Sequence, residues 1–154
     1  MPVMEKAMAF LDEMEVPFEV NALSAHRTPD AVKSFAEGAG ERGIKVIIAG
    51  AGMAAALPGV IAASTTLPVI GVPVKGSVLD GVDALYSILQ MPPGIPVATV
   101  AINGALNAAI LAVEILALSH PTLALSLDRY KSSLGEKIKK ANRDLAEVKY
   151  KYKV

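Results

Sequence analysis

The six residues Ser24-Ala25-His26-Arg27-Thr28-Pro29 bring the side chains that acid–base chemistry needs into one short segment. An imidazole can take up and release a proton near neutral pH, so His26 is a candidate general acid and base. The guanidinium of Arg27 offers a planar set of donors that suits a phosphate or a carboxylate. The segment follows an apolar, strand-like run and leads into a helix at Pro29, a common place for ligand sites in α/β proteins. These residues predict a proton-transfer enzyme that acts on an anionic, phosphorylated small molecule.

A second candidate segment, residues 49–59, consists largely of glycine and alanine. Glycine lets a backbone approach a ligand closely. The spacing is not G-x-G-x-x-G and no G-K-[ST] follows, so neither a dinucleotide-binding turn nor a phosphate-binding P-loop is indicated. On the residues alone, simpler alternatives stay open: His26 is structural, the glycines allow close helix–sheet packing, and the proline loop of residues 90–96 is only a turn before a strand.

Composition excludes several classes of protein. The chain has 154 residues, 53% of them hydrophobic, a formal net charge of zero and no cysteine. Zero net charge gives no long-range attraction to nucleic acid or to an anionic membrane, and without cysteine there is no disulfide or thiolate site. The first residues begin an amphipathic helix instead of a signal peptide. The longest apolar stretch, residues 96–118, is interrupted by two asparagines and a glutamate, which argues against a membrane span. We therefore expect a cytoplasmic protein with no membrane or nucleic-acid partner.

Hydrophobic periodicity predicts alternating helices and strands. We expect strands at residues 18–23, 45–49, 68–74 and 96–102. We expect helices at residues 3–14, 29–41, 58–64, 80–90, 105–119 and from about 123 onward. Strands separated by helices indicate parallel pairing with helices on both faces. The sequence thus predicts a three-layer, flavodoxin-like α/β domain over residues 1–122, followed by a long helix over residues 123–154.

The predicted last helix carries a narrow apolar stripe among many basic residues. Its positions are three or four residues apart: Tyr130, Leu134, Ile138, Ala141, Leu145, Val148 and Tyr152. At about 1.5 Å per residue the helix would be roughly 40 Å long, more than a small domain needs. Such a stripe requires a partner, so we expect this helix to pack on a neighbouring subunit. Packing against its own domain is the alternative.

Several ordered motifs resemble one enzyme family. They are residues 24–29, Ala49-Gly50-Ala51-Gly52 with Leu57-Pro58-Gly59, and the runs at residues 68–74, 87–92, 94–102 and 107–109. Over roughly residues 2–120, the chain resembles the 5-(carboxyamino)imidazole ribonucleotide mutase family of purine biosynthesis. Arg27 and Gly52-Met53-Ala54-Ala55 resemble the mutase branch. The related carboxylase branch, which uses free carbon dioxide, favours a lysine after Ser-Ala-His and a polar glycine loop.

The resemblance implies an isomerase that moves a carboxylate from the exocyclic nitrogen of an imidazole ribonucleotide to a ring carbon. It implies no ATP, metal or organic cofactor. His26 would transfer the protons. Carbon dioxide, released from the nitrogen and then attacked by the ring carbon, would be held in a dry pocket. The resemblance assigns the other binding residues by position: Ser24 and Arg27 at the phosphate or ribose, Ala51, Gly52, Met53 and Leu57 as the pocket wall, and Met91 and Pro92 over the base, from a neighbouring subunit. It also implies a homo-octamer.

The family pattern begins with a strand and a Gly-Ser-x-Ser-Asp loop, whereas this chain matches the pattern from inside the first helix. In a flavodoxin-like order that strand is central, between the strands ending near Leu23 and Ala49. We therefore expect a sheet without its central strand. Three alternatives to the mutase remain open. They are a non-catalytic, truncated subunit of the same assembly, the carboxylase, and a signalling receiver. The last needs acidic residues at strand ends, and Leu23, Ala49 and Val74 occupy those positions.

Overall fold

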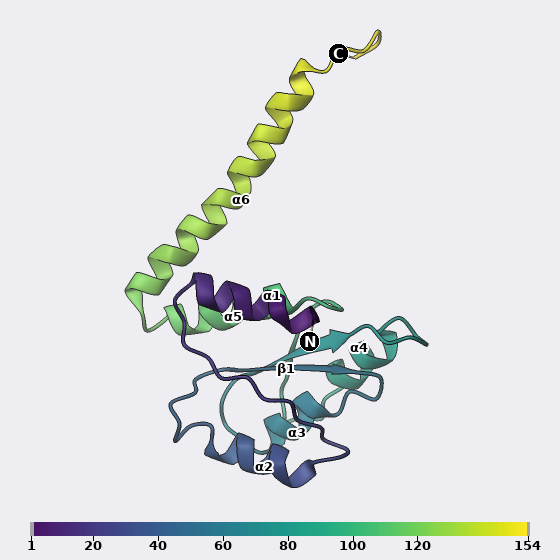
Figure 1. Cartoon of the computed structure of the whole chain (residues 1–154), viewed down its shortest axis with the longest axis vertical. Helices are drawn as coiled ribbons and strands as arrows, with labels where there is room; N and C mark the ends of the chain where they lie inside the picture. The colour runs from purple at the N-terminus through teal and green to yellow at the C-terminus, as the bar shows by residue number, and fades with distance from the viewer. Residues whose placement is uncertain (1, 154) are drawn as a thin grey trace.

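Three apolar segments form the sheet at the centre of the molecule. The computed structural model describes residues 2–153. In them β1 (Ile47–Gly52), β2 (Val69–Val74) and β3 (Ala98–Thr99) pair in parallel in the order β1-β2-β3 (Figure 1). Five of the six residues of β2 are buried. A parallel strand that is covered on both faces needs such a continuous apolar run.

Helices cover both faces of this sheet (Figure 1). On one face lie α1 (Pro2–Glu13) and α5 (Ala105–Ala117), and on the other lie α2 (Pro29–Gly38), α3 (Leu57–Ala63) and α4 (Val82–Leu89). Neighbouring strand residues face opposite layers: Ile70 and Val72 pack with α1 and α5, whereas Val69 packs with α2 and α3. The predicted three-layer, flavodoxin-like α/β fold is confirmed.

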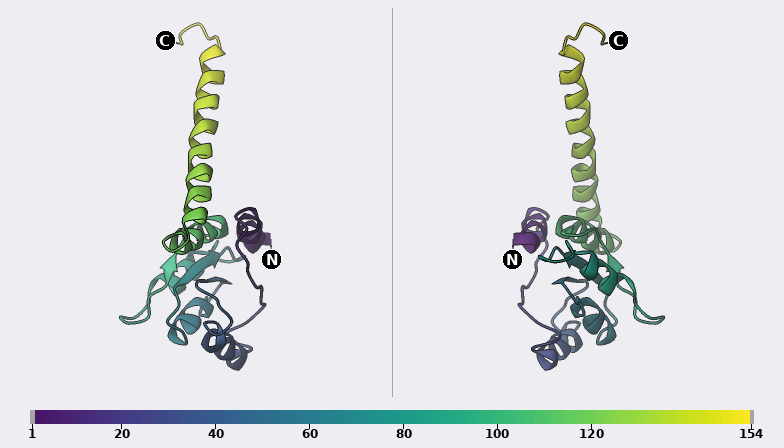
Figure 2. Two further views of the ribbon diagram at one scale, coloured as in Figure 1. Left: turned by 90° about the vertical axis from the view of Figure 1, so that its left-hand side faces the viewer. Right: turned by 90° about the vertical axis from the view of Figure 1, so that its right-hand side faces the viewer.

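The predicted strand at residues 18–23 is wrong. The structure places this segment as an extended coil that leads from the α1 layer to the α2 layer beside β1 (Figures 1 and 2). Its backbone makes no hydrogen bond to another backbone group in the part of the chain that the structure describes. A strand needs a neighbouring strand to pair with, and within residues 2–153 the sheet ends at β1.

Other boundaries differ by a few residues. The helix predicted to reach residue 41 ends at Gly38, and the strand predicted at residues 45–49 extends instead to Gly52. The strand predicted at residues 96–102 is reduced to Ala98–Thr99. Pro96 has no N–H to donate, and the chain turns away at Asn103, whose N–H donates to the carbonyl of Pro73. The glycines at 50 and 52 are thus part of a strand and not of a loop.

The last helix, α6 (Pro121–Glu147), projects from the domain as an isolated rod (Figures 1 and 2). Its first turns are held by buried Leu127 and by the Tyr130 ring, which meets the Phe10 ring edge-on at 4.9 Å. Beyond them the apolar stripe is exposed. The helix ends at Glu147, so Val148 and Tyr152 lie outside the helix and the expectation that they continue its stripe is wrong. The long C-terminal helix itself is confirmed, while its packing on a neighbouring subunit stays a prediction.

The helices formed by residues 2–153 include none that is both long enough and apolar enough to cross a membrane.

Candidate functional site

Two loops meet at the carboxyl end of β1 and border an open cavity of about 450 Å³. One loop joins the coil of residues 17–23 to α2, and the other joins β1 to α3. Seven of the nine predicted site residues line this one cavity: Ser24, His26, Arg27, Ala51, Gly52, Met53 and Leu57. Residues about 25 positions apart in the sequence are therefore brought together at the edge where parallel α/β sheets bind ligands.

The first loop is held by hydrogen bonds between Ser24 and Thr28. The Thr28 hydroxyl accepts from the Ser24 N–H at 3.0 Å and donates to the Ser24 carbonyl at 3.1 Å, while the Thr28 N–H reaches the same carbonyl at 2.8 Å. The Ser24 hydroxyl accepts from the Arg27 N–H at 3.2 Å. These bonds close the loop on itself. They therefore constrain the backbone that carries the side chains of His26 and Arg27.

The His26 and Arg27 side chains are exposed. Within residues 2–153, the imidazole makes no hydrogen bond and the guanidinium makes neither a hydrogen bond nor an ion pair. An uncommitted guanidinium can bind an oxyanion through two parallel N–H groups. An uncommitted imidazole can exchange protons with a bound molecule. The loop thus presents one anion-binding group beside one acid–base group.

The second loop forms the apolar wall of the cavity. A side chain at Gly52 would lie 3.1 Å from the Val74 carbonyl oxygen, so only glycine fits beside β2 without movement. Met53 follows with a φ of 57°, a left-handed conformation that turns the chain away from the strand. Within the loop Ala55 is buried, and Leu57 begins α3. Small residues leave room for a ligand, and the wall carries no charge.

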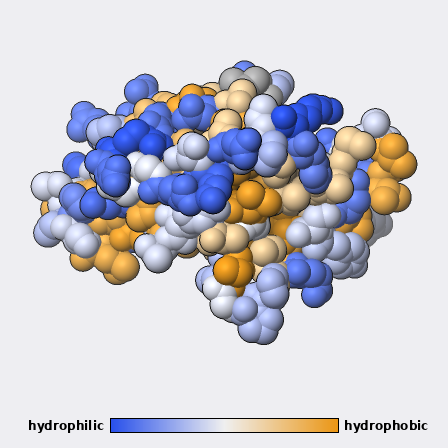
Figure 3. Space-filling model, turned by 90° about the horizontal axis from the view of Figure 1, so that it is seen from below, coloured by the Kyte–Doolittle hydropathy of each residue, from blue (hydrophilic) through white to orange (hydrophobic). Residues whose placement is uncertain are grey.

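The cavity of one chain is open to solvent. Met53 is 66% exposed, and His26 is exposed as well. The expectation of a dry pocket is therefore not met by the single chain. Figure 3 views the molecule from the side opposite α6 and shows hydrophobic atoms at the surface among hydrophilic ones.

Met91 and Pro92 do not line this cavity. The Met91 methyl group packs over α3, 2.8 Å from where a Cβ at Gly59 would stand. Within one chain the structure therefore does not bring these two residues to His26. Their proposed contact with the base requires a second subunit.

Two residues that the sequence analysis did not single out support the site. Thr28 closes the first loop, as described above. Asn103 adopts a φ of 59°, and its Oδ1 accepts from the Lys75 N–H at 2.9 Å, which ties the end of β2 to the turn before α5. Residues after β2 in turn lie against the second loop, since a Cβ at Gly76 would contact Met53. The signal for Asn103 was an Asn-Gly pair directly after a predicted strand, because such pairs favour left-handed turns.

The site therefore combines an imidazole, a guanidinium and an uncharged wall, and its lining residues include no carboxylate. This set suits proton transfer to and from a small anion whose reacting part needs an apolar environment. It lacks the acidic strand ends that a signalling receiver requires, so that alternative finds no support.

Comparison with known proteins gives a consistent result. The family model described as AIR carboxylase matches residues 1–137. The N5-carboxyaminoimidazole ribonucleotide mutase of Thermotoga maritima is 51% identical over 98% of this chain and 88% of its own length. The protein of the same name from Pyrococcus horikoshii is 52% identical over 96% of this chain and 84% of its own.

A fungal relative has a different name and a greater length. The phosphoribosylaminoimidazole carboxylase of Schizosaccharomyces pombe is 53% identical over 96% of this chain, which corresponds to 27% of the fungal protein. Among solved structures, the crystal structure of Treponema denticola PurE superimposes with a TM-score of 0.83 at 28% identity. The match covers 94% of this chain and 90% of that one.

Proposed function

Because the chain belongs to the AIR carboxylase family, we propose that it is a mutase of purine biosynthesis. It moves the carboxylate of 5-(carboxyamino)imidazole ribonucleotide from the exocyclic nitrogen to the neighbouring ring carbon. The observation that supports this proposal is identity of about half to curated mutases over almost the whole chain. The cavity shared by His26, Arg27 and the uncharged wall is consistent with it.

The reaction consists of two proton transfers around one carbon–carbon bond formation. The imidazolium of His26 gives its proton to the exocyclic nitrogen, and the bond from that nitrogen to the carboxylate carbon breaks. This leaves a neutral amine and carbon dioxide. The ring carbon then attacks the carbon dioxide, and neutral His26 removes the proton from that ring carbon. His26 ends in the protonation state in which it began, so the cycle needs no cofactor.

The remaining residues bind and confine the reactants. Arg27 and the Ser24 hydroxyl hold the phosphate or ribose through charge-assisted hydrogen bonds. The released carbon dioxide is confined by the uncharged wall, which consists of Ala51, Gly52, Met53 and Leu57. An uncharged wall suits this molecule, because in water it would diffuse away or become hydrated.

The open cavity supports assembly with further copies of the chain. Met91 and Pro92 of a neighbouring subunit cover the base, and the stripe of α6 packs on another chain. The family resemblance suggests a homo-octamer, located in the cytoplasm and acting on a small-molecule ribonucleotide without nucleic acid or membrane. Burial of His26 and Met53 in that assembly would exclude water from the reaction.

Two other functions are distinguishable from the mutase. The fungal similarity favours carboxylation of aminoimidazole ribonucleotide by free carbon dioxide. The other function is that of a non-catalytic subunit that assembles without turnover. The test is an ultraviolet absorbance assay with two substrates. Turnover of the carboxyamino compound without added bicarbonate supports the mutase. Turnover only of the amino compound with bicarbonate supports the carboxylase, and no turnover of either by the assembled protein supports the non-catalytic subunit.

A further inference from the structure

The hydroxyl of Thr28 does not bind where a threonine at this position usually does. Thr28 directly precedes α2, a place where the threonine hydroxyl commonly accepts from the exposed N–H groups of the first helical turn. Here it makes no such hydrogen bond. It bonds back into the loop instead, where it accepts from the Ser24 N–H at 3.0 Å and donates to the Ser24 carbonyl at 3.1 Å. The helix thus lacks a side-chain cap, and the loop gains two hydrogen bonds.

The backbone of Thr28 connects the same loop to the core. Its carbonyl accepts from the Val32 N–H at 3.1 Å, and the Val32 side chain is completely buried. Its N–H donates to the Ser24 carbonyl at 2.8 Å. Thr28 therefore joins the first turn of α2 to the start of the loop. Residues 25–27, which include His26 and Arg27, lie between the two joined positions.

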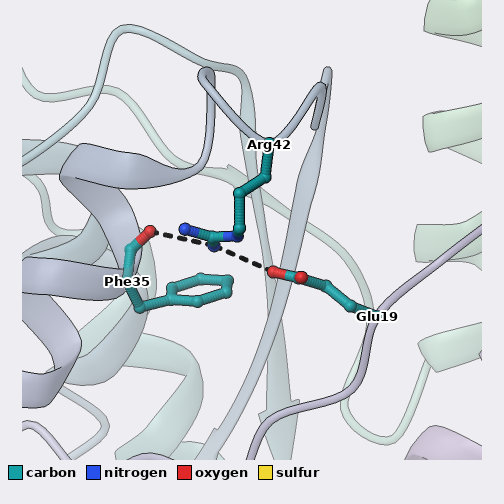
Figure 4. A network of polar contacts seen from close by, with 3 residues as sticks. All are labelled: Glu19, Phe35 and Arg42. Atoms are coloured by element: carbon teal, nitrogen blue, oxygen red, sulfur yellow. Dashed lines mark hydrogen bonds and ion pairs between the residues drawn. The ribbon is translucent and has the colours of Figure 1, made fainter.

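A separate contact holds the two arms of this loop together farther from the site. The Arg42 guanidinium donates to the Glu19 carboxylate at 2.9 Å and to the Phe35 carbonyl at 3.2 Å (Figure 4). Glu19 lies in the coil that enters the loop, and Phe35 lies in α2, which follows it. The guanidinium also lies 5.2 Å from the centre of the Phe35 ring. Because Arg42 already joins the arms, the two bonds of the Thr28 hydroxyl constrain the loop between them.

The side chains of His26 and Arg27 differ in how strongly they depend on the backbone of the loop. An imidazole has few rotatable bonds, so the backbone of His26 largely sets the position of the ring nitrogens. Proton transfer needs a distance of about 2.6–3.2 Å between the two heavy atoms. The Arg27 side chain is longer and more flexible, so its guanidinium can reach an anion from a displaced backbone. Movement of the loop would therefore impair proton transfer more than anion binding.

We propose that Thr28 is a positioning residue for the reaction. Its hydroxyl holds the backbone of the loop so that the His26 imidazole is correctly placed for proton transfer, and Thr28 itself touches no reacting atom. Fixed placement of a reacting group is a large part of enzymatic rate enhancement. This inference rests on the proposed function, because it assigns His26 the same role.

Thr28→Val is the main test, because valine keeps the branched shape of threonine and removes only the hydroxyl. The ultraviolet assay should show kcat lowered by about 10–100-fold, since a displacement of about 1 Å can cost about 100-fold in rate. KM should change little. Thr28→Ser restores the hydroxyl and should recover most of the lost kcat. Thr28 is exposed, so both variants should fold and assemble as the parent chain does, which light scattering checks.

Two further variants are matched controls. The Thr65 hydroxyl also accepts from a backbone N–H, that of Leu67 at 3.2 Å, but it precedes β2 and lies at the opposite end of the sheet from the site. Thr65→Val should therefore keep the kcat and KM of the parent chain. Arg42→Met removes the contact between the arms and keeps the Thr28 hydroxyl, so it should lower stability to urea but lower kcat much less than Thr28→Val does.

Amide hydrogen exchange, followed by NMR, tests the loop without the reaction. In Thr28→Val the Ser24 amide loses its acceptor. If the hydroxyl holds the loop, the amides of Arg27 and Thr28 should also exchange at least about fivefold faster than in the parent chain, although their own acceptors on Ser24 remain. All three amides should keep the parent rates in Thr28→Ser and in Thr65→Val.

Three results would overturn the inference. The first is an unchanged exchange rate of the Arg27 and Thr28 amides in Thr28→Val. The second is a higher KM with unchanged kcat, because the hydroxyl would then support binding and not proton transfer. The third is an equal loss of kcat in Thr65→Val or Arg42→Met, which would indicate an effect of general stability. A parent chain without turnover would overturn the proposed function instead, and the exchange rates would still decide whether Thr28 holds the loop.

Discussion

At the scale of single residues, the proposed chemistry depends on the side chain of His26. Its loop is closed by Ser24 and Thr28, and its imidazole has no hydrogen-bond partner in the described chain. In the proposed reaction it acts twice on the substrate, first as a general acid and then as a general base. The sequence predicts this residue as the proton carrier, because proton transfer at neutral pH restricts the choice of side chain, and the structure places it at the cavity. The closure by Thr28 could not be predicted, since it depends on loop geometry.

Replacement of His26 by asparagine should lower kcat by at least about 100-fold, because general acid–base catalysis contributes about 10²–10⁴ in rate. Asparagine keeps the polarity and approximate size but cannot exchange the proton. The ultraviolet assay measures the loss, and light scattering checks that the assembly is unchanged. His120→Asn is the matched control: the His120 ring is exposed and meets the Leu116 carbonyl at 2.9 Å, outside the site. Similar losses in both variants would remove His26 from the mechanism.

Arg27→Met should raise KM by about 10–100-fold, since a hydrogen bond to a charged group contributes about 1.5–3 kcal/mol. In the proposed role the side chain binds the substrate anion and takes no part in the proton transfers, so kcat should fall much less. Lys33→Met on α2 removes another exposed positive charge and should leave KM unchanged. A fall in kcat with unchanged KM for Arg27→Met would contradict the binding role.

At the scale of elements, hydrophobic patterns predicted most helices to within a few residues but misjudged the edges of the sheet. Residues 18–23 have the alternation of a strand, yet a strand also needs a partner, and local pattern contains no information about one. Gly50 and Gly52 lie in β1, beyond the strand end predicted at residue 49, and at Gly52 the nearby Val74 carbonyl favours glycine. Most helices and strands could therefore be predicted from the sequence. The residues at which they end could not, because the ends depend on tertiary contacts.

Asn103 ties two elements together, so its loss should affect stability. Its side chain accepts from the Lys75 N–H and its left-handed backbone favours asparagine over alanine. Asn103→Ala should lower the free energy of unfolding by about 1–3 kcal/mol, as removal of one partner of a hydrogen bond does. Urea denaturation measures this change. Asn142→Ala, on the exposed part of α6, should stay within about 0.5 kcal/mol of the parent chain. Equal stability of the two variants would show that the Asn103 contacts are not stabilising.

At the scale of the whole molecule, the single chain leaves two surfaces uncovered: the candidate site and α6. The helix is attached near its start, where Leu127 is buried and Lys131 pairs with Glu114 of α5. Farther along, Ile138 and Leu145 are 65% and 61% exposed. An apolar stripe on a projecting helix is stable in water chiefly when another chain covers it.

The double change Ile138→Asp and Leu145→Asp should reduce the molar mass in light scattering to that of a smaller species, because it places two charges in the proposed contact. Ser133→Asp with Lys140→Asp has the same seven-residue spacing on the opposite side of the helix and should keep the parent mass. If the first variant also keeps the parent mass, α6 is not the element that joins the subunits.

The central claim is that one carboxylate moves within one bound substrate, and isotope transfer tests it most directly. The assembled protein is given 5-(carboxyamino)imidazole ribonucleotide whose carboxylate carries ¹³C, in a buffer with excess unlabelled bicarbonate, and the product is examined by mass spectrometry. We predict that the product keeps nearly all of the ¹³C, because the released carbon dioxide is recaptured before it leaves the apolar wall. A product that contains only unlabelled carboxylate would contradict the account, since the carbon dioxide would then come from solution.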